Sequence, residues 1–161
     1  MDSVFDRLSC KLTAAGVAFD VLRHAPVFTS EEAAAVRGTS LASGAKALIC
    51  KVDDRFVLIV MPADRRLASK LVRKAVGIKS IRFATQDEVQ QLTGLAPGSI
   101  PPFGSLFALP TWCDELLAQQ PRINFNAGDH AISLSLTYAD FVRFEQPNVG
   151  AYSEPPAPRA A

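Results

Sequence analysis

The stretch KALICKVDDRFVLIVM, residues 46–61, decides the fold. It holds two runs rich in β-branched and other apolar residues, 46–52 and 55–61, separated by the polar pair Asp53-Asp54. Two β-rich runs joined through two polar residues predict a β-hairpin. We therefore expect a sheet built on this hairpin.

Helices and short strands are predicted on both sides of the hairpin. Before it, apolar periodicity and capping signals indicate a helix over 3–15, a strand over 17–22, and a helix from a capping box at 29–32 to residue 36. After it, Asp64 can cap a helix that carries Leu67, Leu71 and Ala75 on one face and ends at Gly77.

The second half of the chain continues this mixture. A strand over 80–83 and a helix from the capping box 85–88 to residue 92 precede a loop over 94–104 that is rich in Gly and Pro. Then follow a strand over 105–109, a helix over 112–118, strands over 122–126 and 131–136, and a helix from Thr137 to Phe144. Strands and helices mixed without regular alternation predict an α+β fold around a mixed or antiparallel sheet.

The composition is that of one compact domain: 161 residues, 48% hydrophobic and 20% charged. The formal net charge of +1 creates no overall field that would attract polyanions, so any contact with nucleic acid must be local. The sequence shows no signal-peptide pattern and no long apolar run, and we expect a soluble cytoplasmic protein without membrane contact. From residue 146 to 161, prolines and alanines predict a flexible tail.

General catalytic motifs are missing from the sequence. It has no phosphate loop, dinucleotide fingerprint, nucleophile elbow or zinc-binding histidine pair. Cys10, Cys50 and Cys113 are dispersed in apolar surroundings without metal-ligand spacing, which predicts buried free thiols, no metal site and no cofactor.

Three local features could carry chemistry, and the first is Lys46 at the mouth of the first hairpin strand, behind Gly44. A lysine there can hold a phosphate as a point charge, or it can simply extend from the sheet edge to water.

The second feature is the loop 94–104, whose glycines allow backbone amides to approach a ligand while its prolines hold the shape. An ordinary rigid connection is the alternative.

The third feature is the polar turn Asn124–Ser133 between two apolar strands. It is a plausible hairpin turn in its own right. His130 could transfer a proton near neutral pH, although a single histidine beside a turn is more often solvated or satisfied by its neighbours, and the same holds for His24.

Taken together and in order, four segments over residues 1–145 resemble the YbaK/ProX-like family, which includes the editing domain of bacterial prolyl-tRNA synthetases and its free-standing relatives. The matching pieces are His24-x-x-x-x-Thr29-x-Glu31-Glu32-Ala33, Lys46 in a Gly-x-Lys-x-Leu setting, Gly98-x-x-x-Pro102 with Phe103-Gly104, and Phe125-Asn126-Ala127-Gly128-x-His130-x-x-Ser133. Each piece alone is weak, whereas the ordered set is specific.

The resemblance implies a partly barrel-like α+β editing domain over 1–145 that deacylates mischarged tRNA in trans. In family terms, Lys46 anchors the 3′-terminal nucleotide, and the loop Gly98, Ser99, Ile100, Pro101 and Pro102 lies against the ester, where amides stabilise the oxyanion. No nucleophilic side chain and no cofactor are needed, because the ester is already activated. The implied substrate contacts are His24, Thr29, Lys46, Phe103, Gly104, Asn126, Gly128, His130 and Ser133.

The implied substrate is a small amino acid such as alanine, serine or threonine, since a pocket excludes larger groups sterically, and the proline tRNA is one implied carrier. The implied partners are the acceptor end of aminoacyl-tRNA and an aminoacyl-tRNA synthetase. Basic residues between 65 and 74 form a solvated helix face or contact the tRNA backbone. Two alternatives stay open: a non-catalytic tRNA- or nucleotide-binding module associated with a synthetase, and a small-molecule hydrolase or sensor.

Overall fold

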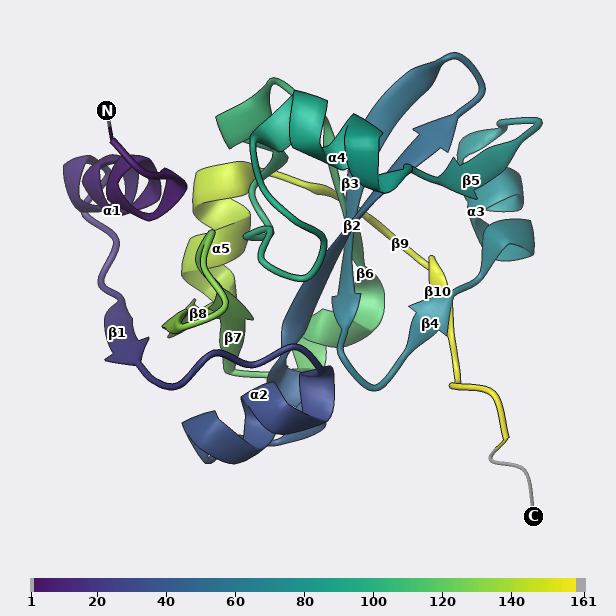
Figure 1. Cartoon of the computed structure of the whole chain (residues 1–161). Coiled ribbons are helices and arrows are strands. Elements are labelled where there is room, and N and C mark those ends of the chain that lie inside the picture. The colour runs from purple at the N-terminus through teal and green to yellow at the C-terminus, as the bar shows by residue number, and fades with distance from the viewer. Residues whose placement is uncertain (1, 159–161) are drawn as a thin grey trace.

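The structure is a computed structural model that describes residues 2–158, drawn in Figure 1. These residues form α-helices, short 3-10 helices and β-strands in a mixed order, which confirms the predicted α+β class. The helices are α1 (Val4–Ala14), α2 (Ser30–Arg37), α3 (Ser69–Val76), α4 (Gln86–Thr93) and α5 (Tyr138–Glu145), with 3-10 turns η1 (Leu41–Ser43), η2 (Gly104–Phe107) and η3 (Glu115–Gln119). The strands are β1 (Asp20–Arg23), β2 (Ala45–Val52), β3 (Arg55–Pro62), β4 (Arg66–Leu67), β5 (Ile81–Phe83), β6 (Thr111–Asp114), β7 (Arg122–Asn126), β8 (Ile132–Thr137), β9 (Asn148–Gly150) and β10 (Ser153–Glu154).

The predicted hairpin, β2–β3, is the centre of a five-stranded sheet with the order β5-β2-β3-β6-β9. Its register runs from Ala45 opposite Pro62 to Val52 opposite Arg55, and Asp53 takes a positive φ of 51° in the turn. β6 and β9 add parallel to β3, so the sheet is mixed, as expected. Both of its faces are buried, because alternate residues of β2 and β3 belong to two different apolar clusters.

A smaller antiparallel sheet, β1-β8-β7, lies beside the first one (Figure 1). The two sheets meet where Gly44, just before β2, forms a bridge with Asn124 of β7. No closed barrel forms among residues 2–158; the two sheets stay separate apart from this bridge, so the partly barrel-like sheet expected from the resemblance is not found there. The junction lies where β2 begins, next to Lys46.

Two predictions for residues 105–118 are wrong. The segment expected as a strand at 105–109 contains the 3-10 turn η2, and the segment expected as a helix at 112–118 begins with strand β6 and continues as η3. Trp112 and Cys113 are buried between β3 and β9, so pairing within the sheet overrides the local helical pattern.

The helix predicted to begin at Asp64 begins later. Arg66 and Leu67 form β4, which pairs with β10, and α3 then starts at Ser69 without a side-chain cap. The basic residues of this segment are therefore divided: Arg65 precedes β4, Arg66 lies in β4, and Lys70, Arg73 and Lys74 lie on α3. Cys10 also differs from expectation because it is exposed, whereas Cys50 and Cys113 are buried.

The chain is folded beyond residue 145, where the flexible tail was expected to begin. β9 pairs with β6, β10 pairs with β4, and Tyr152 is buried against Trp112. The buried carboxylate of Asp114 accepts hydrogen bonds from the amides of Tyr152 (2.8 Å) and Ser153 (2.9 Å). Prolines and alanines signal a flexible tail only where no such pairing partner exists, so the tail prediction is wrong for 148–154.

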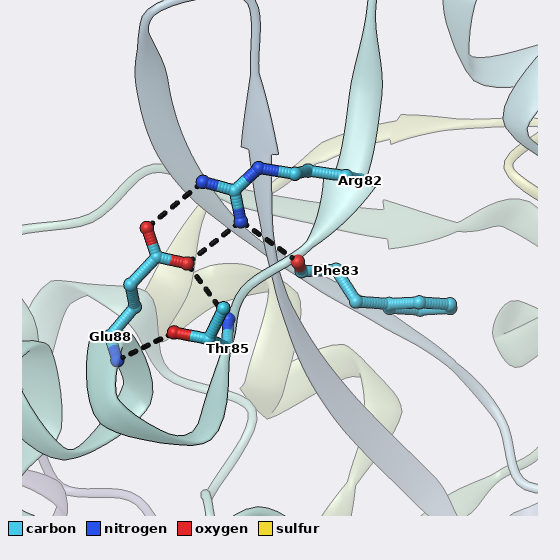
Figure 2. A network of polar contacts seen from close by, with 4 residues as sticks. All are labelled: Arg82, Phe83, Thr85 and Glu88. Carbon is cyan, nitrogen blue, oxygen red and sulfur yellow. Dashed lines mark hydrogen bonds and ion pairs between the residues drawn. The ribbon is translucent and has the colours of Figure 1, made fainter.

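The first residues of α1, α2 and α4 lie where the capping residues of the sequence place them. Ser3 with Asp6 and Thr85 with Glu88 form complete capping boxes, whereas at 29–32 only Thr29 makes its bond, accepting from the amide of Glu32 (3.1 Å). Figure 2 shows that Arg82 adds two hydrogen bonds to Glu88, at 2.7 and 3.0 Å. This pair and the cap hold the pKa of Glu88 down, at about 2.

Candidate functional site

A cavity of about 180 Å³ opens at the junction of the two sheets. Its walls come from α2, the start of β2, the end of β7 and the loop that contains Gly98 and Ile100. The small side chains Ala33, Ala34, Ala45 and Ala63 supply methyl groups, and the polar wall consists of Thr29, Ser30, Arg37, Lys46, Asn124 and Asn126. The four segments of the sequence signature therefore converge on this part of the molecule.

Lys46 lies in this cavity, at the mouth of β2 as predicted. Its Nζ donates to the backbone oxygen of Arg65, which leaves two of its three N–H donors for a ligand. Burial lowers the pKa of Lys46 below its usual value, and the carboxylates of Asp64 and Glu31 act against this shift. The ammonium is thus fixed at the cavity wall and partly removed from water.

Arg37 is a second cation at the cavity, which the sequence analysis did not select. Its Nε donates to Ser133 Oγ (2.8 Å) and its Nη2 to Asn126 Oδ1 (2.9 Å). Burial lowers the pKa of Arg37 to about 10. No carboxylate of residues 2–158 pairs with it, so an uncompensated positive charge faces the cavity. One signal could have found it: Ala33 and Arg37 share one face of α2, and the N-cap Thr29 precedes Ala33 by the same four-residue spacing.

His24 and Ser133 support Arg37 from behind, since neither lines the cavity. His24 Nδ1 lies 2.8 Å from the carbonyl of Ala25, which can only accept, so Nδ1 carries the proton. Its Nε2, 2.8 Å from Ser133 Oγ, then accepts from that hydroxyl, whose lone pair takes the Arg37 bond. The predicted substrate contacts His24 and Ser133 therefore orient Arg37.

The loop at 96–99 is a tight turn. Ser99 N donates to Ala96 O (3.3 Å), Pro97 and Gly98 are the central residues, and Gly98 has a φ of +89°. Proline followed by a residue with positive φ is the type II arrangement, in which glycine is favoured at the second central position. Asn126 Nδ2 donates to Gly98 O (2.8 Å) and thereby ties the turn to β7.

Few amides of this loop are left for a ligand. Pro101 and Pro102 have no N–H, and the Ser99 amide is used within the turn. The amides of Gly98 and Ile100 donate to no other group within the described residues, and both residues line the cavity. Pro101 and Pro102 are buried and shape the loop from below.

The remaining predicted residues divide into two groups. Gly128 and His130 line a second hollow next to the cavity, together with Ser99, whose carbonyl accepts from Gly128 N (2.8 Å). Phe103 and Gly104, predicted as substrate contacts, lie in the core instead. Phe103 is fully buried among Phe125, Phe141 and Phe144, and Gly104 approaches the Leu109 carbonyl so closely that a Cβ would lie 2.6 Å from it.

Two broader findings complete the description. Nowhere in residues 2–158 do three His, Cys, Asp or Glu side chains gather as a possible metal site. No helix over the same residues is long and apolar enough to cross a membrane. The cavity lining contains two cations, alanine methyl groups, and Gly98 and Ile100, whose amides have no partner among residues 2–158; this set suits an anionic ligand with a small apolar or weakly polar group.

Comparison with known proteins gives a consistent picture. The model of the aminoacyl-tRNA editing domain family matches residues 24–144. The multifunctional Ser/Thr-tRNA deacylase ProXp-y of Escherichia coli K12 is 36% identical over 148 residues, which cover 89% of each chain. The prolyl-tRNA editing protein ProX of Acetoanaerobium sticklandii is 22% identical over 86% of this chain and 88% of its own. A crystal structure of a candidate trans-editing enzyme for prolyl-tRNA synthetase superposes with a TM-score of 0.84 at 25% identity, covering 96% and 99% of the two chains.

Proposed function

Because this chain belongs to the aminoacyl-tRNA editing domain family and is an aminoacyl-tRNA deacylase that acts in trans, we propose that the cavity at the sheet junction hydrolyses the ester of a small amino acid on mischarged tRNA. The family resemblance inferred from the sequence is thereby confirmed. One observation carries the assignment of the site: Lys46 and the unpaired amides of Gly98 and Ile100 line the same small cavity.

The proposed reaction uses water as the nucleophile. The water oxygen attacks the ester carbonyl, whose oxygen gains negative charge; the bond to the ribose oxygen then breaks, and that oxygen takes the proton released by the water. In this proposal the amides of Gly98 and Ile100, two residues that line the cavity, bind the negative oxygen, and a preorganised donor of this kind contributes about 2.7–4 kcal/mol. Arg37 adds positive charge in the same enclosure.

Lys46 serves the tRNA rather than the bond that breaks. We assign to it the phosphate of the 3′-terminal nucleotide, since it is held in the cavity wall and two of its donors are free. A lysine at such a position binds as a point charge and contributes about 1.5–3 kcal/mol through charge-assisted hydrogen bonds.

The cavity favours a small amino acid. Its volume of about 180 Å³ lies below the roughly 300–1,000 Å³ of pockets that take drug-sized ligands. The lining combines alanine methyl groups with Asn124 and Asn126, which suits a short side chain with a hydroxyl. Together with the similarity to a Ser/Thr-tRNA deacylase, this supports serine or threonine as the group removed, with alanine next.

The test is a panel of tRNAs charged with labelled serine, threonine, alanine and proline, with loss of the ester followed over time. We expect faster release of serine and threonine than of proline. A protein that binds these tRNAs without accelerating release of any amino acid would be a binding module, and the proposal would fail.

Two further features depend on this function. Association with a synthetase would deliver the mischarged tRNA, and co-sedimentation of this protein with a prolyl-tRNA synthetase tests it. We assign this function to a domain over residues 1–145, because α1 and β1 pack with the matched residues 24–144; β9 and β10 add further strand pairs beyond it. Since aminoacyl-tRNA is made in the cytoplasm, we propose that location for the protein.

A further inference from the structure

Phe28 is an exposed aromatic residue at the edge of the cavity. Its side chain is 72% exposed, the largest value among the exposed large hydrophobic residues of the part of the chain described. Its ring lies 4.8 Å from the ring of His130, centroid to centroid, at an angle of 39°. Phe28 lines both the cavity and the neighbouring hollow, and His130 lines the hollow, so the pair of rings lies at the hollow's side of the cavity edge. A ring in this position offers its face to a flat group that enters the hollow.

The hollow beside this pair differs from the cavity in its chemistry. It is bounded by Pro26, Leu95 and Ala96 on the apolar side, and by Ser99, Gly128 and Asp129 on the polar side. No lysine or arginine lines it, and its one acidic residue is Asp129. A phosphate would be repelled there, whereas a flat, neutral, aromatic group would find two rings and an apolar edge.

We propose that the base of the 3′-terminal nucleotide stacks on the Phe28–His130 pair while the ester on its ribose enters the cavity. This inference rests on the proposed function, because the ester and the base are attached to the same ribose. The loop 96–99 separates the two spaces: Gly98 faces the cavity and Ser99 the hollow. Unpaired bases at RNA ends are commonly bound by stacking on aromatic side chains.

This arrangement also assigns a purpose to His130. Its Nδ1 lies 3.1 Å from the carbonyl of Val27, which can only accept, so this nitrogen carries a proton and the ring is fixed against Phe28. The histidine then orients the aromatic surface and takes no part in proton transfer at the ester. The sequence motif that includes His130 thus belongs to base recognition.

The experiment measures binding of an RNA hairpin that carries no aminoacyl group and has a single-stranded 3′ end. Its last base is 2-aminopurine, and the fluorescence of this base falls when it stacks. We expect strong quenching with the wild-type protein and with Phe28→Tyr, and affinity weakened about five- to 150-fold by Phe28→Ala. Phe83 is 58% exposed on β5, away from the cavity, so Phe83→Ala is the matched control and should bind like wild type.

A second RNA that lacks the terminal base completes the test. Phe28→Ala should bind it as wild type does, because the stacking partner is already absent. Equal weakening of both RNAs by Phe28→Ala, or full quenching without the Phe28 ring, would overturn the proposal. Since neither RNA carries an aminoacyl ester, these results do not depend on ester hydrolysis. Failure of the proposed function would appear separately in the deacylation panel.

Discussion

Replacing Gly98 by valine tests the catalytic role assigned to the loop. Gly98 has a φ of +89°, which a β-branched residue essentially never adopts, and a Cβ there would lie 3.5 Å from His130 Cε1. This is an ordinary contact distance, so the Cβ of valine would not clash. Valine instead disturbs the backbone conformation of the turn. We expect the turn to change type, which rotates the Pro97–Gly98 peptide and moves the Gly98 amide away from the ester.

The sizes of the competing effects decide the outcome. Keeping a left-handed conformation costs alanine about 1–2 kcal/mol, and the Asn126 bond that holds the Gly98 carbonyl is worth about 0.5–1.5 kcal/mol. Gly98→Ala should therefore populate both turn types and lose activity moderately. In Gly98→Val the strain exceeds the bond, the amide is lost, and the saturated rate should fall about a hundred- to a thousandfold.

Gly77→Val is the matched control, since Gly77 has a φ of +68° with open space for a Cβ, and it ends α3 away from the cavity. Both variants should lose about 1–3 kcal/mol of stability, read from denaturant unfolding. Only Gly98→Val should slow single-turnover deacylation at saturating enzyme, with RNA binding little changed. If it weakens binding and leaves the saturated rate intact, the loop is a recognition element.

Four other changes test separate parts of the structure. Lys46→Ala should lower the deacylation rate about ten- to a hundredfold at unchanged melting temperature. Lys51→Ala, on the same strand but outside the cavity, should leave the deacylation rate unchanged, and equal loss of rate in the two variants would remove Lys46 from the site. Arg37→Lys keeps a charge but cannot make both side-chain hydrogen bonds in the same geometry, so the deacylation rate should fall, and an unchanged rate would show that the guanidinium is dispensable. Because the pKa of Glu88 is lowered from 4.5 to about 2, its stabilising effect is complete above pH 4.5 and is lost as the pH falls toward 2. Glu88→Gln should therefore flatten the dependence of the unfolding free energy on pH between 4.5 and about 2. An identical pH dependence in the variant would contradict the Arg82–Glu88 pair. Asp114→Ala should expose 148–154 to rapid amide exchange while the β2–β3 hairpin stays protected, and continued protection of 148–154 would show that strand pairing alone holds the segment.

The sequence by itself determined the elements whose cause is local. The β2–β3 hairpin follows from two apolar runs around Asp53-Asp54, and the starts of α1 and α4 follow from capping residues three positions apart. Lys46 and the Gly98 loop could be selected because glycine, proline and a cation at a strand mouth restrict what the chain can do there. All of these depend on residues that are neighbours in the sequence.

Only the tertiary structure decided the features that depend on distant partners. Thr111–Asp114 is a strand because β3 and β9 lie on either side, and residues 148–154 are ordered because Asp114 accepts their amides. Arg37 is a site residue because the fold brings Asn126 and Ser133, which lie about 90 residues further along the chain, to its guanidinium. Phe103 was predicted as a substrate contact but is a core residue, because its ring packs against those of Phe125, Phe141 and Phe144. Local propensity is worth tenths of a kcal/mol per residue, and burial of a large side chain is worth about 1.5–3 kcal/mol, so long-range packing prevails wherever the two disagree.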